Sequence, residues 1–399
     1  MISPALPGDS YLIMLSVDHL GPFAIFKGAL FSLIVVLCVL LAKAIRHRRN
    51  LKAVPIRIHV AGTRGKSTTV RLIAAALRAQ GMRVLAKTTG TQPRLIAVDG
   101  SEIHWSRLGP ATIREQSRLL DLAARERVDA IVVECMAIRP EMIRASEWYF
   151  VRATTTVITN ARDDHQEDLE ATGTTMGESL LHVVPQRGRL VISDEIAVKA
   201  FSALAFSAGT SIETVVTSSA DPLDATRQLA AAVAIDHGVN PALLSQAFSN
   251  VRPDPGAFAL HPMTIMGRNI TFANAFSCND VGSFKKLWLT RIEGQAAVIL
   301  LNGRDDRPLR TIAFLTLFGE LYPTPRIFVS GCCRQAIARA RRSGLGKLPV
   351  TKLVTNDPLE VFTLLAAAGD GESTTIWGVG NYRGLGAKLT EYLELRNLC

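Results

Sequence analysis

The chain has few aromatic residues and few cysteines. Aromatic residues make up 6% of the 399 residues, and the 6 cysteines include no C-x-x-C pair. Without such pairs or any metal-ligand spacing, a disulfide framework and a zinc site of the usual kind are excluded, and the cysteines are typical of reduced cytosolic or buried thiols. The sequence also contains no internal repeat and no low-complexity tract, which excludes a repeat architecture.

Acidic residues are scarce relative to basic ones. The chain has 35 Asp and Glu against 45 Lys and Arg, a formal net charge of +10 and a pI near 9.6. This imbalance suggests an acidic partner, which could be an anionic lipid, a nucleic acid, or an acidic substrate or product. A soluble enzyme with one basic patch would show the same overall charge. The length allows two or three domains, each with its own core.

One long apolar segment lies near the N-terminus. Residues 23–42 contain Lys27 as their only charge, and about 20 apolar residues are enough to span a bilayer as a helix. Lys27 lies near one end, where its side chain can extend toward the interface. A cleaved signal peptide would need a basic start and a small-residue cleavage site, and neither is present. We therefore expect a transmembrane helix, with a buried helix of a soluble protein as the alternative.

The charges on either side of this segment predict its orientation. Asp9 and Asp18 precede it without any Lys or Arg, whereas residues 43–54 form a basic linker. Because basic residues remain on the cytoplasmic side, residues 1–22 are expected to be extracytoplasmic and the rest of the chain cytoplasmic. The sequence thus predicts a single-pass protein of the cell inner (plasma) membrane.

After the linker, short β-branched runs alternate with segments of helical spacing. Continuous apolar strands with intervening helices are typical of a parallel sheet covered by helices. We expect a central α/β domain over residues 55–251, with helices at 66–80, 113–127 and 174–184 and a helical stretch at 222–251. The expected strands are residues 56–62, 83–87, 130–135, 155–160 and 189–193.

A second α/β domain is expected after residues 252–258, RPDPGAF, whose prolines and glycine are typical of an interdomain linker. The alternation of strands and helices then starts again. Residues 252–399 are therefore expected to form a smaller, Rossmann-like C-terminal domain. Its strands are expected within residues 269–276, 295–303, 326–331, 351–356 and 374–381.

The loop after the first expected strand has the end of a phosphate-binding motif. HVAGTRGKSTT contains Gly65-Lys66-Ser67, which fits the end of G-x-x-x-x-G-K-[ST], although Val60 stands where the first glycine would be. Strand, glycine-containing loop and helix are the context that such a loop requires, because N–H groups at a helix start face phosphate oxygens. A chance match at a strand–helix turn is the alternative. The expected nucleotide-binding residues here are Gly62, Thr63, Arg64, Gly65, Lys66, Ser67 and Thr68.

Polar residues follow two other expected strands. Glu134 ends the apolar strand of VVECMA, and a carboxylate there is costly to bury unless it is paired or bound to metal. TNARDDH places Asn160, Asp163, Asp164 and His165 just past the next strand. Each of these residues alone is explained by a helix cap or a solvated loop. Because the ends of neighbouring strands are close together, the set suggests a site for a nucleotide with Mg²⁺.

Together these motifs resemble those of a known enzyme family. GTRGKST, VVECMA and TNARDDH are similar to elements of the Mur ligase superfamily, whose members join a carboxylate to an amine using ATP. RLGPATIREQ, RPDPGAF, NAFSCNDVGS and NGRDDRPLR are similar to the ligase subunit of poly-γ-glutamate synthases, from about residue 56 to the C-terminus. Mur enzymes carry a UDP-sugar domain before the loop. The short distance from the membrane segment leaves no room for one here, so a UDP-linked precursor is not expected.

The resemblance implies roles for individual residues. Lys66 would hold the β- and γ-phosphates of ATP, and Arg64 would meet the γ-phosphate or the substrate carboxylate. In the C-terminal domain Arg304 and Asn274 would reach the phosphates, although helix caps and surface ion pairs explain them equally well. The implied catalytic residues are Lys66, Glu134, His165 and Arg304, and the implied Mg²⁺ ligands are Ser67, Glu134 and His165.

The metal site shows one departure from the family. Many Mur ligases carry a carbamylated lysine after their D-x-H segment, but no Lys stands between Lys87 and Lys199. Glu178 lies at nearly the right distance and would supply a carboxylate to the metal directly. A solvated helix face explains Glu178 more simply.

An acidic substrate is expected after the second strand of the central domain. Basic and hydroxyl groups there could hold a carboxylate-rich acceptor, and Arg307 could assist from the C-terminal domain. The expected substrate-binding residues are Lys87, Thr88, Thr89, Arg94 and Arg307.

The resemblance predicts an ADP-forming acid–amino-acid ligase with an N-terminal transmembrane helix, a Mur-ligase-like central ATP-binding domain and a Rossmann-like C-terminal domain. It would join glutamate through γ-amide bonds with ATP and Mg²⁺. Its partners would be glutamate or an acidic peptide or polymer, the membrane and integral subunits of a polymer synthase and export complex, with no nucleic acid. Another Mur- or folylpolyglutamate-type ligase, a membrane-tethered regulatory ATPase and a non-catalytic scaffold are the alternatives.

Overall fold

The computed structural model contains two compact units, Met1–Ala53 and Val54–Cys399. Within them the structure describes residues 22–90, 93–107, 109, 111–161, 169, 173–194, 196–217, 222–251, 257–278, 281–291, 297–304, 308–321, 324–331, 334–340, 349–369 and 373–396. Each unit is considered by itself.

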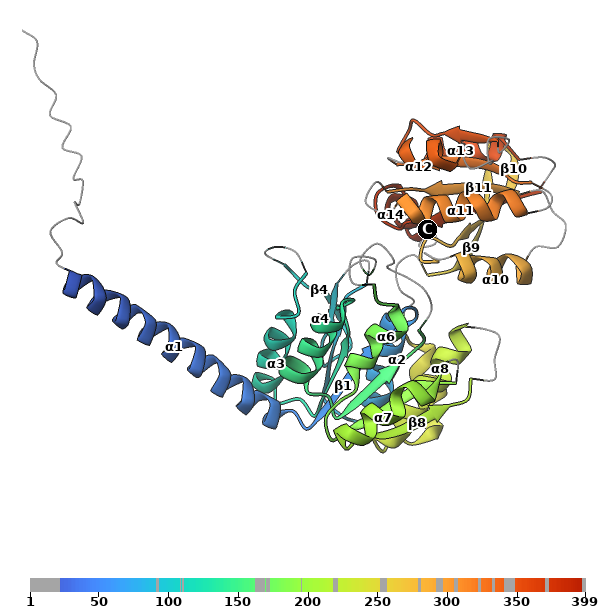
Figure 1. Cartoon of the computed structure of the whole chain (residues 1–399). Coiled ribbons are helices and arrows are strands. Elements are labelled where there is room, and N and C mark those ends of the chain that lie inside the picture. The colour runs from blue at the N-terminus through green and yellow to red at the C-terminus, as the bar shows by residue number, and fades with distance from the viewer. Residues whose placement is uncertain are drawn as a thin grey trace, which may run out of the picture. The chain divides into compact units, whose positions relative to one another are not determined.

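The described part of the first unit is one helix, α1 (Pro22–Ala53), drawn in blue in Figure 1. Its 32 residues correspond to a length of about 48 Å. Phe26–Ala53 is long and apolar enough to cross a membrane by length and composition. The helix continues through the basic residues that were expected as a linker, because no Gly or Pro interrupts residues 29–54 and Lys and Arg favour helices. Pro55 follows the last turn.

The second unit contains a sheet of eight strands in the order β4-β3-β2-β5-β1-β6-β7-β8. The strands from β2 to β8 along this order are parallel, whereas β3 and β4 are antiparallel to their neighbours. Every residue of β2, β5 and β6 is buried, as expected for strands covered on both faces. The bounds are β1 Ile56–Ala61, β2 Val84–Thr88, β3 Arg94–Ile96, β4 Glu102–His104, β5 Ala130–Glu134, β6 Thr155–Ile158, β7 Arg189–Ser193 and β8 Ser211–Val215.

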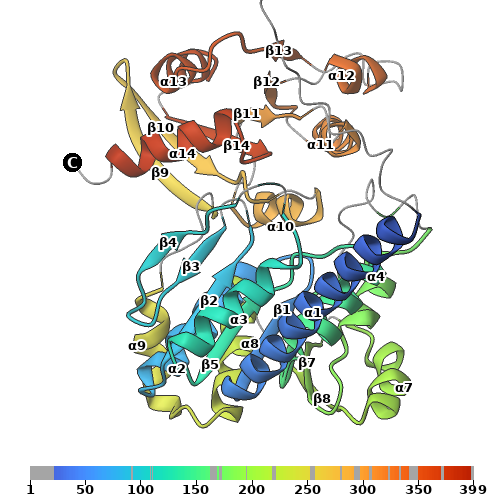
Figure 2. The ribbon, with the colours of Figure 1, turned by 90° about the vertical axis from the view of Figure 1, so that its left-hand side faces the viewer.

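Helices lie on both faces of this sheet (Figure 2), and apolar side chains pack them against it in two layers. One layer packs α2, α8 and α9 against Val60, Val84 and Val132, and the other packs α4, α6 and α7 against Ala61 and Ile158. The helical elements are α2 Lys66–Ala79, α3 Glu115–Arg125, α4 Pro140–Ala145, the π-helix η2 Ser146–Val151, α6 Met176–Leu180, the 3-10 turn η4 Leu181–Val183, α7 Val198–Ala208, α8 Pro222–Asp236, the 3-10 turn η5 Pro241–Leu243 and α9 Leu244–Ser249.

The C-terminal part of the chain forms a second sheet of six strands in the order β13-β12-β11-β14-β10-β9. All pairings are parallel except that of β9 with β10, and β9 carries Pro262, which is tolerated on an edge strand. The elements are β9 Ala259–Ile265, β10 Arg268–Asn274, α10 Val281–Arg291, β11 Ala297–Asn302, α11 Pro308–Glu320, β12 Arg326–Ser330, α12 Arg334–Ala340, β13 Val350–Lys352, α13 Pro358–Ala367, β14 Ser373–Gly380 and α14 Leu385–Arg396.

The α/β prediction with two largely parallel sheets is confirmed. The hairpin of β3 and β4 was not expected, because each of its strands has only 3 residues and shows little apolar alternation. The strand β9 was also missed, since its residues are alternately half-buried and exposed and lie beside the expected linker.

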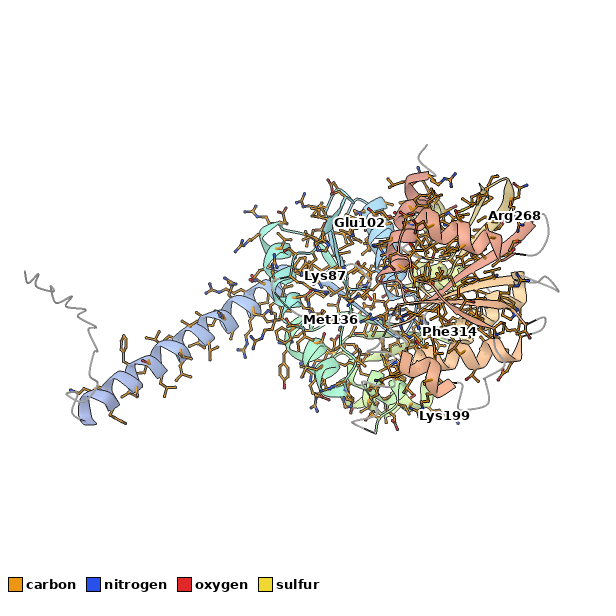
Figure 3. The ribbon with its side chains drawn as sticks, turned by 90° about the horizontal axis from the view of Figure 1, so that it is seen from above. Lys87, Glu102, Met136, Lys199, Arg268 and Phe314 are labelled. Carbon is orange, nitrogen blue, oxygen red and sulfur yellow. The ribbon has the colours of Figure 1, made fainter. Side chains whose placement is uncertain are left out.

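An aromatic cluster forms the centre of the C-terminal domain. Phe284 of α10 is fully buried and packs edge-on against Trp377 of β14 at 5.4 Å between ring centroids. It also contacts Phe318 at 5.8 Å and Phe314 at 5.9 Å, and Phe314 is labelled in Figure 3. One side chain thus links two helices and the middle of the sheet.

We expect Phe284→Ala to reduce the free energy of unfolding of the C-terminal domain by about 3–5 kcal/mol, because the substitution leaves a cavity that these rings cannot fill. Denaturant unfolding followed by tryptophan fluorescence would measure the loss. Leu289→Ala on the same helix is the control, since Leu289 is 65% exposed and its truncation should change little. Equal losses in the two variants would contradict this assignment of the core.

Candidate nucleotide and magnesium site

The loop between β1 and α2 requires glycine at two positions. Gly62 has a φ of 121°, and a Cβ atom there would lie 2.2 Å from Thr159 Oγ1. Gly65 has a φ of 77° and directly precedes α2. A side chain at Gly62 would therefore push the loop away from β6. The loop is thus a compact strand-to-helix turn, although Val60 replaces the first glycine of the longer motif.

Residues that follow β6 hold the outer side of this loop. Asn160 Oδ1 accepts a hydrogen bond from the Arg64 backbone N–H at 3.0 Å, and Asn160 Nδ2 donates to the Arg64 carbonyl at 3.1 Å. Thr159 Oγ1 donates to the same carbonyl at 2.6 Å, and Thr63 Oγ1 donates to Asn160 Oδ1. These contacts fix the loop before any ligand binds.

The start of α2 is built to receive an anion. Gly65 provides no side-chain cap, so the first N–H groups of the helix are not used by a capping side chain. Lys66 Nζ bends back over the loop and donates to the carbonyls of Gly62 at 2.8 Å and Thr63 at 3.2 Å. The N–H groups and the Lys66 ammonium therefore converge on the loop, as a phosphate requires. Thr68 lies half-buried in the first turn of α2.

The buried carboxylate of Glu134 lies at the end of β5, 3% exposed. Its Oε2 accepts from Ser67 Oγ at 2.9 Å and from the Thr89 backbone N–H at 2.6 Å. Three segments that are distant in the sequence thus meet at one carboxylate. Ser67 and Glu134, two of the predicted metal ligands, thus lie in contact, and their role as Mg²⁺ ligands stays a prediction.

These residues fit Mg²⁺ as far as the structure describes them. The Ser67 hydroxyl and the Glu134 carboxylate form an oxygen pair, and hard cations prefer oxygen ligands. In the part of the chain described here, no group of three His, Cys, Asp or Glu side chains gathers into a metal site. Asp163, Asp164 and His165 lie outside the described residues.

Glu178 has a different local role. It is exposed and forms a capping box at the start of α6, with its Oε2 accepting from Thr175 N–H at 2.8 Å. These hydrogen bonds lower the pKa of the Glu178 carboxyl below its usual range. The metal role expected for Glu178 stays a prediction.

The predicted substrate residue Lys87 lies inside the central domain (Figure 3), with 0% of its surface exposed. Its ammonium pairs with Glu115 at 2.8 Å and lies over the Trp105 ring at 5.2 Å from the centroid. Burial lowers the pKa of Lys87, and the Glu115 carboxylate partly opposes this effect. Glu115 also accepts from Arg107 Nε at 2.7 Å. Lys87 therefore connects β2 to α3 through its ion pair with Glu115.

The other residues predicted to bind substrate lie at the end of β2 and in β3. Thr88 is opposite Arg94 in the β2–β3 pairing. The Thr88 hydroxyl is buried without a hydrogen-bond partner among the described residues, and Arg94 is half-buried. Thr89 contacts the Glu134 carboxylate through its backbone N–H. Of these three residues, the structure shows only Thr89 in contact with the carboxylate of Glu134, and the substrate role of Thr88 and Arg94 stays a prediction.

In the C-terminal domain the predicted residues lie at strand ends. Asn274 ends β10, where its Nδ2 donates to Thr390 Oγ1 at 3.2 Å, so its amide is used inside the domain. Arg304 follows β11 and is half-buried. Arg307 lies outside the described residues.

Sequence reasoning overlooked two further groups at these edges. Thr226 of α8 faces the loop, since a Cβ atom on Gly65 would lie 3.2 Å from Thr226 Oγ1. Arg310, in the first turn of α11, donates from Nη1 to Asn381 Oδ1 at 2.9 Å, which places it at the carboxyl edge of the second sheet. Thr226 gave no sequence signal, whereas Arg310 stands in the quoted stretch NGRDDRPLR.

A buried pair of charged residues lies on the other face of β1. His59 Nδ1 is 2.7 Å from Glu147 Oε2, and both residues are 0% exposed. Burial alone would lower the pKa of His59, but the neighbouring Cys135 sulfur and Glu147 carboxylate together raise it to about 10. His59 is therefore an imidazolium at neutral pH.

Because the pKa of His59 is raised in the folded state, its stabilising effect is complete below the unfolded value of 6.5 and disappears as the pH rises through about 10. We expect the difference in unfolding free energy between wild type and His59→Gln to shrink steadily from neutral pH to pH 10. Urea unfolding at several pH values would measure it. A difference that does not change with pH would show that His59 is neutral in the folded protein.

Two protein-family profiles match consecutive parts of the chain. The Mur ligase middle domain matches residues 60–225, which include the loop and Glu134. The poly-gamma-glutamate synthase CapB C-terminal domain matches residues 260–396.

Individual proteins are similar to this chain over both of these regions. PGA synthase CapB of Bacillus subtilis (strain 168) is 28% identical over 382 residues, which cover 90% of this chain and 95% of that protein. Escherichia coli FolC in complex with ADP is similar in fold, with a TM-score of 0.63, 16% identity and coverage of 90% of this chain and 93% of FolC. A Yersinia pestis folylpolyglutamate synthase/dihydrofolate synthase complexed with AMPPNP and Mn ion is also similar in fold, with a TM-score of 0.60 and 13% identity. The similarity covers 88% of this chain and 92% of that protein. Residues 60–225 therefore match a Mur ligase middle domain and residues 260–396 a CapB-type C-terminal domain, a combination that indicates an ATP-dependent amide ligase similar to PGA synthase CapB.

Proposed function

We propose that this protein polymerises glutamate by joining the γ-carboxyl group of one residue to the amino group of the next, with ATP converted to ADP and phosphate. The observation that carries the proposal is the contact of Glu134 with Ser67 and Thr89 beside the glycine-containing loop. This contact supports a nucleotide site with a cation, and the match to PGA synthase CapB supports glutamate as the substrate.

The chemistry follows from the properties of a carboxylate. A carboxylate is a poor acyl donor, because its leaving group would be an oxide. Transfer of the γ-phosphoryl group of ATP to a carboxylate oxygen forms an acyl phosphate and releases ADP. The amine nitrogen then attacks the carbonyl carbon, the C–O bond to phosphate breaks, and the amine loses a proton. The protein mainly aligns the reactants and neutralises charge.

The loop between β1 and α2 would bind the phosphates of ATP. Lys66 would leave the loop carbonyls that it contacts and bind the β- and γ-phosphates, since a phosphate oxygen is a stronger partner for an ammonium than a neutral carbonyl. Backbone N–H groups from Gly65 to Thr68 would surround the phosphates, because those of Thr63 and Arg64 already donate to Asn160. Asn160 holds the main chain of Arg64, and the Arg64 side chain would contact the γ-phosphate or the substrate carboxylate.

Ser67 and Glu134 would hold Mg²⁺, with His165 as a third ligand. When bound, the ion would neutralise charge that develops on the phosphate oxygens. The Ser67 hydroxyl now donates to Glu134, so it would turn a lone pair toward the ion while the carboxylate keeps the Thr89 N–H. Glu178 would join this set only by giving up its capping box.

Acidic substrate would bind beside this site. Thr89 contacts Glu134, Thr88 precedes it at the end of β2, and Arg94 opposite Thr88 would provide a cation for a substrate carboxylate. Lys87 would act indirectly, by holding β2 in place through its ion pair with Glu115, which also pairs with Arg107. Arg304 and Arg307, with Asn274 as a packing residue at the same sheet edge, would contribute from the C-terminal domain.

The apolar helix α1 supports a location at the inner membrane. Its basic C-terminal turns favour a cytoplasmic position for the two α/β domains. One helix cannot form a path for a polymer through a bilayer. We therefore include integral membrane subunits of a synthesis and export complex among the proposed partners.

The assay uses the full-length protein in membranes with ATP, Mg²⁺ and either L- or D-glutamate. We expect ADP, phosphate and an amide-linked polymer, and we expect Lys66→Ala to lower the turnover at least about 100-fold by removing the phosphate-binding charge. Arg125→Ala is the control, because Arg125 is exposed at the end of α3. AMP as product would contradict the acyl-phosphate route. ATP turnover that no amino acid or acidic peptide changes would favour a regulatory ATPase.

A further inference from the structure

The pair of His59 and Glu147 is unusual in its burial. Both side chains are completely enclosed, and their closest atoms are 2.7 Å apart. Removing two charges from water costs several kcal/mol per ion, and apolar residues of similar volume often give a fold of equal or greater stability. Replacing the whole pair by apolar residues is therefore expected to preserve the stability of the fold. A buried ion pair does, however, fix the relative positions of the segments that carry it.

Glu147 connects three segments of the protein. Its Oε2 contacts His59 of β1 and lies 3.5 Å from Thr156 Oγ1 of β6. Its Oε1 accepts from the Ala153 backbone N–H at 2.8 Å, just before β6. His59 in turn contacts Cys135, which directly follows β5. The carboxylate thus links β1 to β6, and His59 extends the connection to Cys135 at the end of β5, all on one face of the sheet.

The position of Glu147 is itself fixed by an irregular helix. Glu147 lies in the π-helix η2, whose wider turn is closed by a hydrogen bond from Arg152 N–H to the Glu147 carbonyl at 2.7 Å. Arg57 of β1 donates from Nε to the carbonyls of Val151 at 3.2 Å and Arg152 at 3.0 Å. Single π-turns are frequent near functional sites. Here the π-turn brings Glu147 over the middle of β1.

The same three strands carry the nucleotide site on their carboxyl ends. β1 leads into the loop with Lys66 and Ser67, β5 ends at Glu134, and β6 leads to Asn160. Main-chain hydrogen bonds continue the connection, from Cys135 N–H to the Val60 carbonyl at 2.7 Å and from Thr159 N–H to the Ala61 carbonyl at 3.0 Å. His59 is three residues before Gly62, and successive side chains of a strand alternate between its faces. The pair therefore acts on the sheet directly behind the site.

We propose that Glu147 and His59 are positioning residues, which set the spacing between the ends of β1, β5 and β6 and thereby keep Ser67 and Glu134 at the distance that a shared cation requires. This inference rests on the proposed nucleotide and Mg²⁺ site. It assigns no contact with substrate to either residue.

Two variants separate positioning from simple stabilisation. Glu147→Gln removes the charge but keeps an acceptor for Ala153. The double variant His59→Leu with Glu147→Leu replaces the pair by apolar side chains. Val233→Ala is the control, because Val233 is fully buried in α8 and its truncation lowers stability without touching the strand ends.

The measurement is the Mg²⁺ concentration for half-maximal ATP turnover, together with thermal unfolding and binding of a fluorescent ADP analogue with and without Mg²⁺. We expect both variants to need at least about 10-fold more Mg²⁺, the usual cost of losing support behind a metal site. The double variant should retain the unfolding temperature of the wild type, and Val233→Ala should lower that temperature without changing the Mg²⁺ requirement.

A double variant that unfolds at the normal temperature and needs no additional Mg²⁺ would overturn the inference. If the double variant does not fold, Glu147→Gln decides in the same way. A wild-type protein that binds no nucleotide in a Mg²⁺-dependent way would overturn the proposed function itself. If the wild type binds nucleotide in a Mg²⁺-dependent way and the variants have the same Mg²⁺ requirement as the wild type, only the positioning role is overturned.

Discussion

The hydrogen bonds of one buried carboxylate organise the central domain. Glu134 lies at the end of a fully buried strand, where an unpaired negative charge would be costly. The Ser67 hydroxyl and the Thr89 N–H both donate to its Oε2, so the first turn of α2 and the end of β2 are held against β5. The phosphate-binding loop, the proposed metal site and the proposed substrate residues therefore share one fixed point. Any movement of that carboxylate would change all three.

The rest of the central domain keeps this point in place from both faces of the sheet. On one face α2, α8 and α9 pack against the strands through apolar side chains, and on the other the His59–Glu147 pair connects the strands by charge. Asn160 and Thr159 hold the loop from the side of β6. Lys87 and Glu115 support β2 from within the domain. Apolar packing thus supplies most of the stability, and the few buried polar contacts supply the geometry.

Much of the fold was predictable from the sequence because its strands are continuous apolar runs and its helices have clear spacing. Ser67 and Glu134 were predictable because a motif marks one and a carboxylate at a strand end marks the other. Lys87 was different: its place at a strand end beside hydroxyl and basic residues suggested a substrate residue, but its burial beside Glu115 depends on α3, which no local pattern reveals. Glu147 and Thr226 come from segments without a motif, and only the tertiary packing brings them to β1 and to the loop.

The central claim is that the carboxylate is activated by direct phosphoryl transfer at this site. The most direct measurement uses glutamate carrying ¹⁸O in its γ-carboxyl group and follows the label in the released phosphate by mass spectrometry. The account predicts that phosphate acquires ¹⁸O in proportion to the amide bonds formed, because one carboxylate oxygen leaves with the phosphoryl group. Amide bond formation with unlabelled phosphate would contradict it.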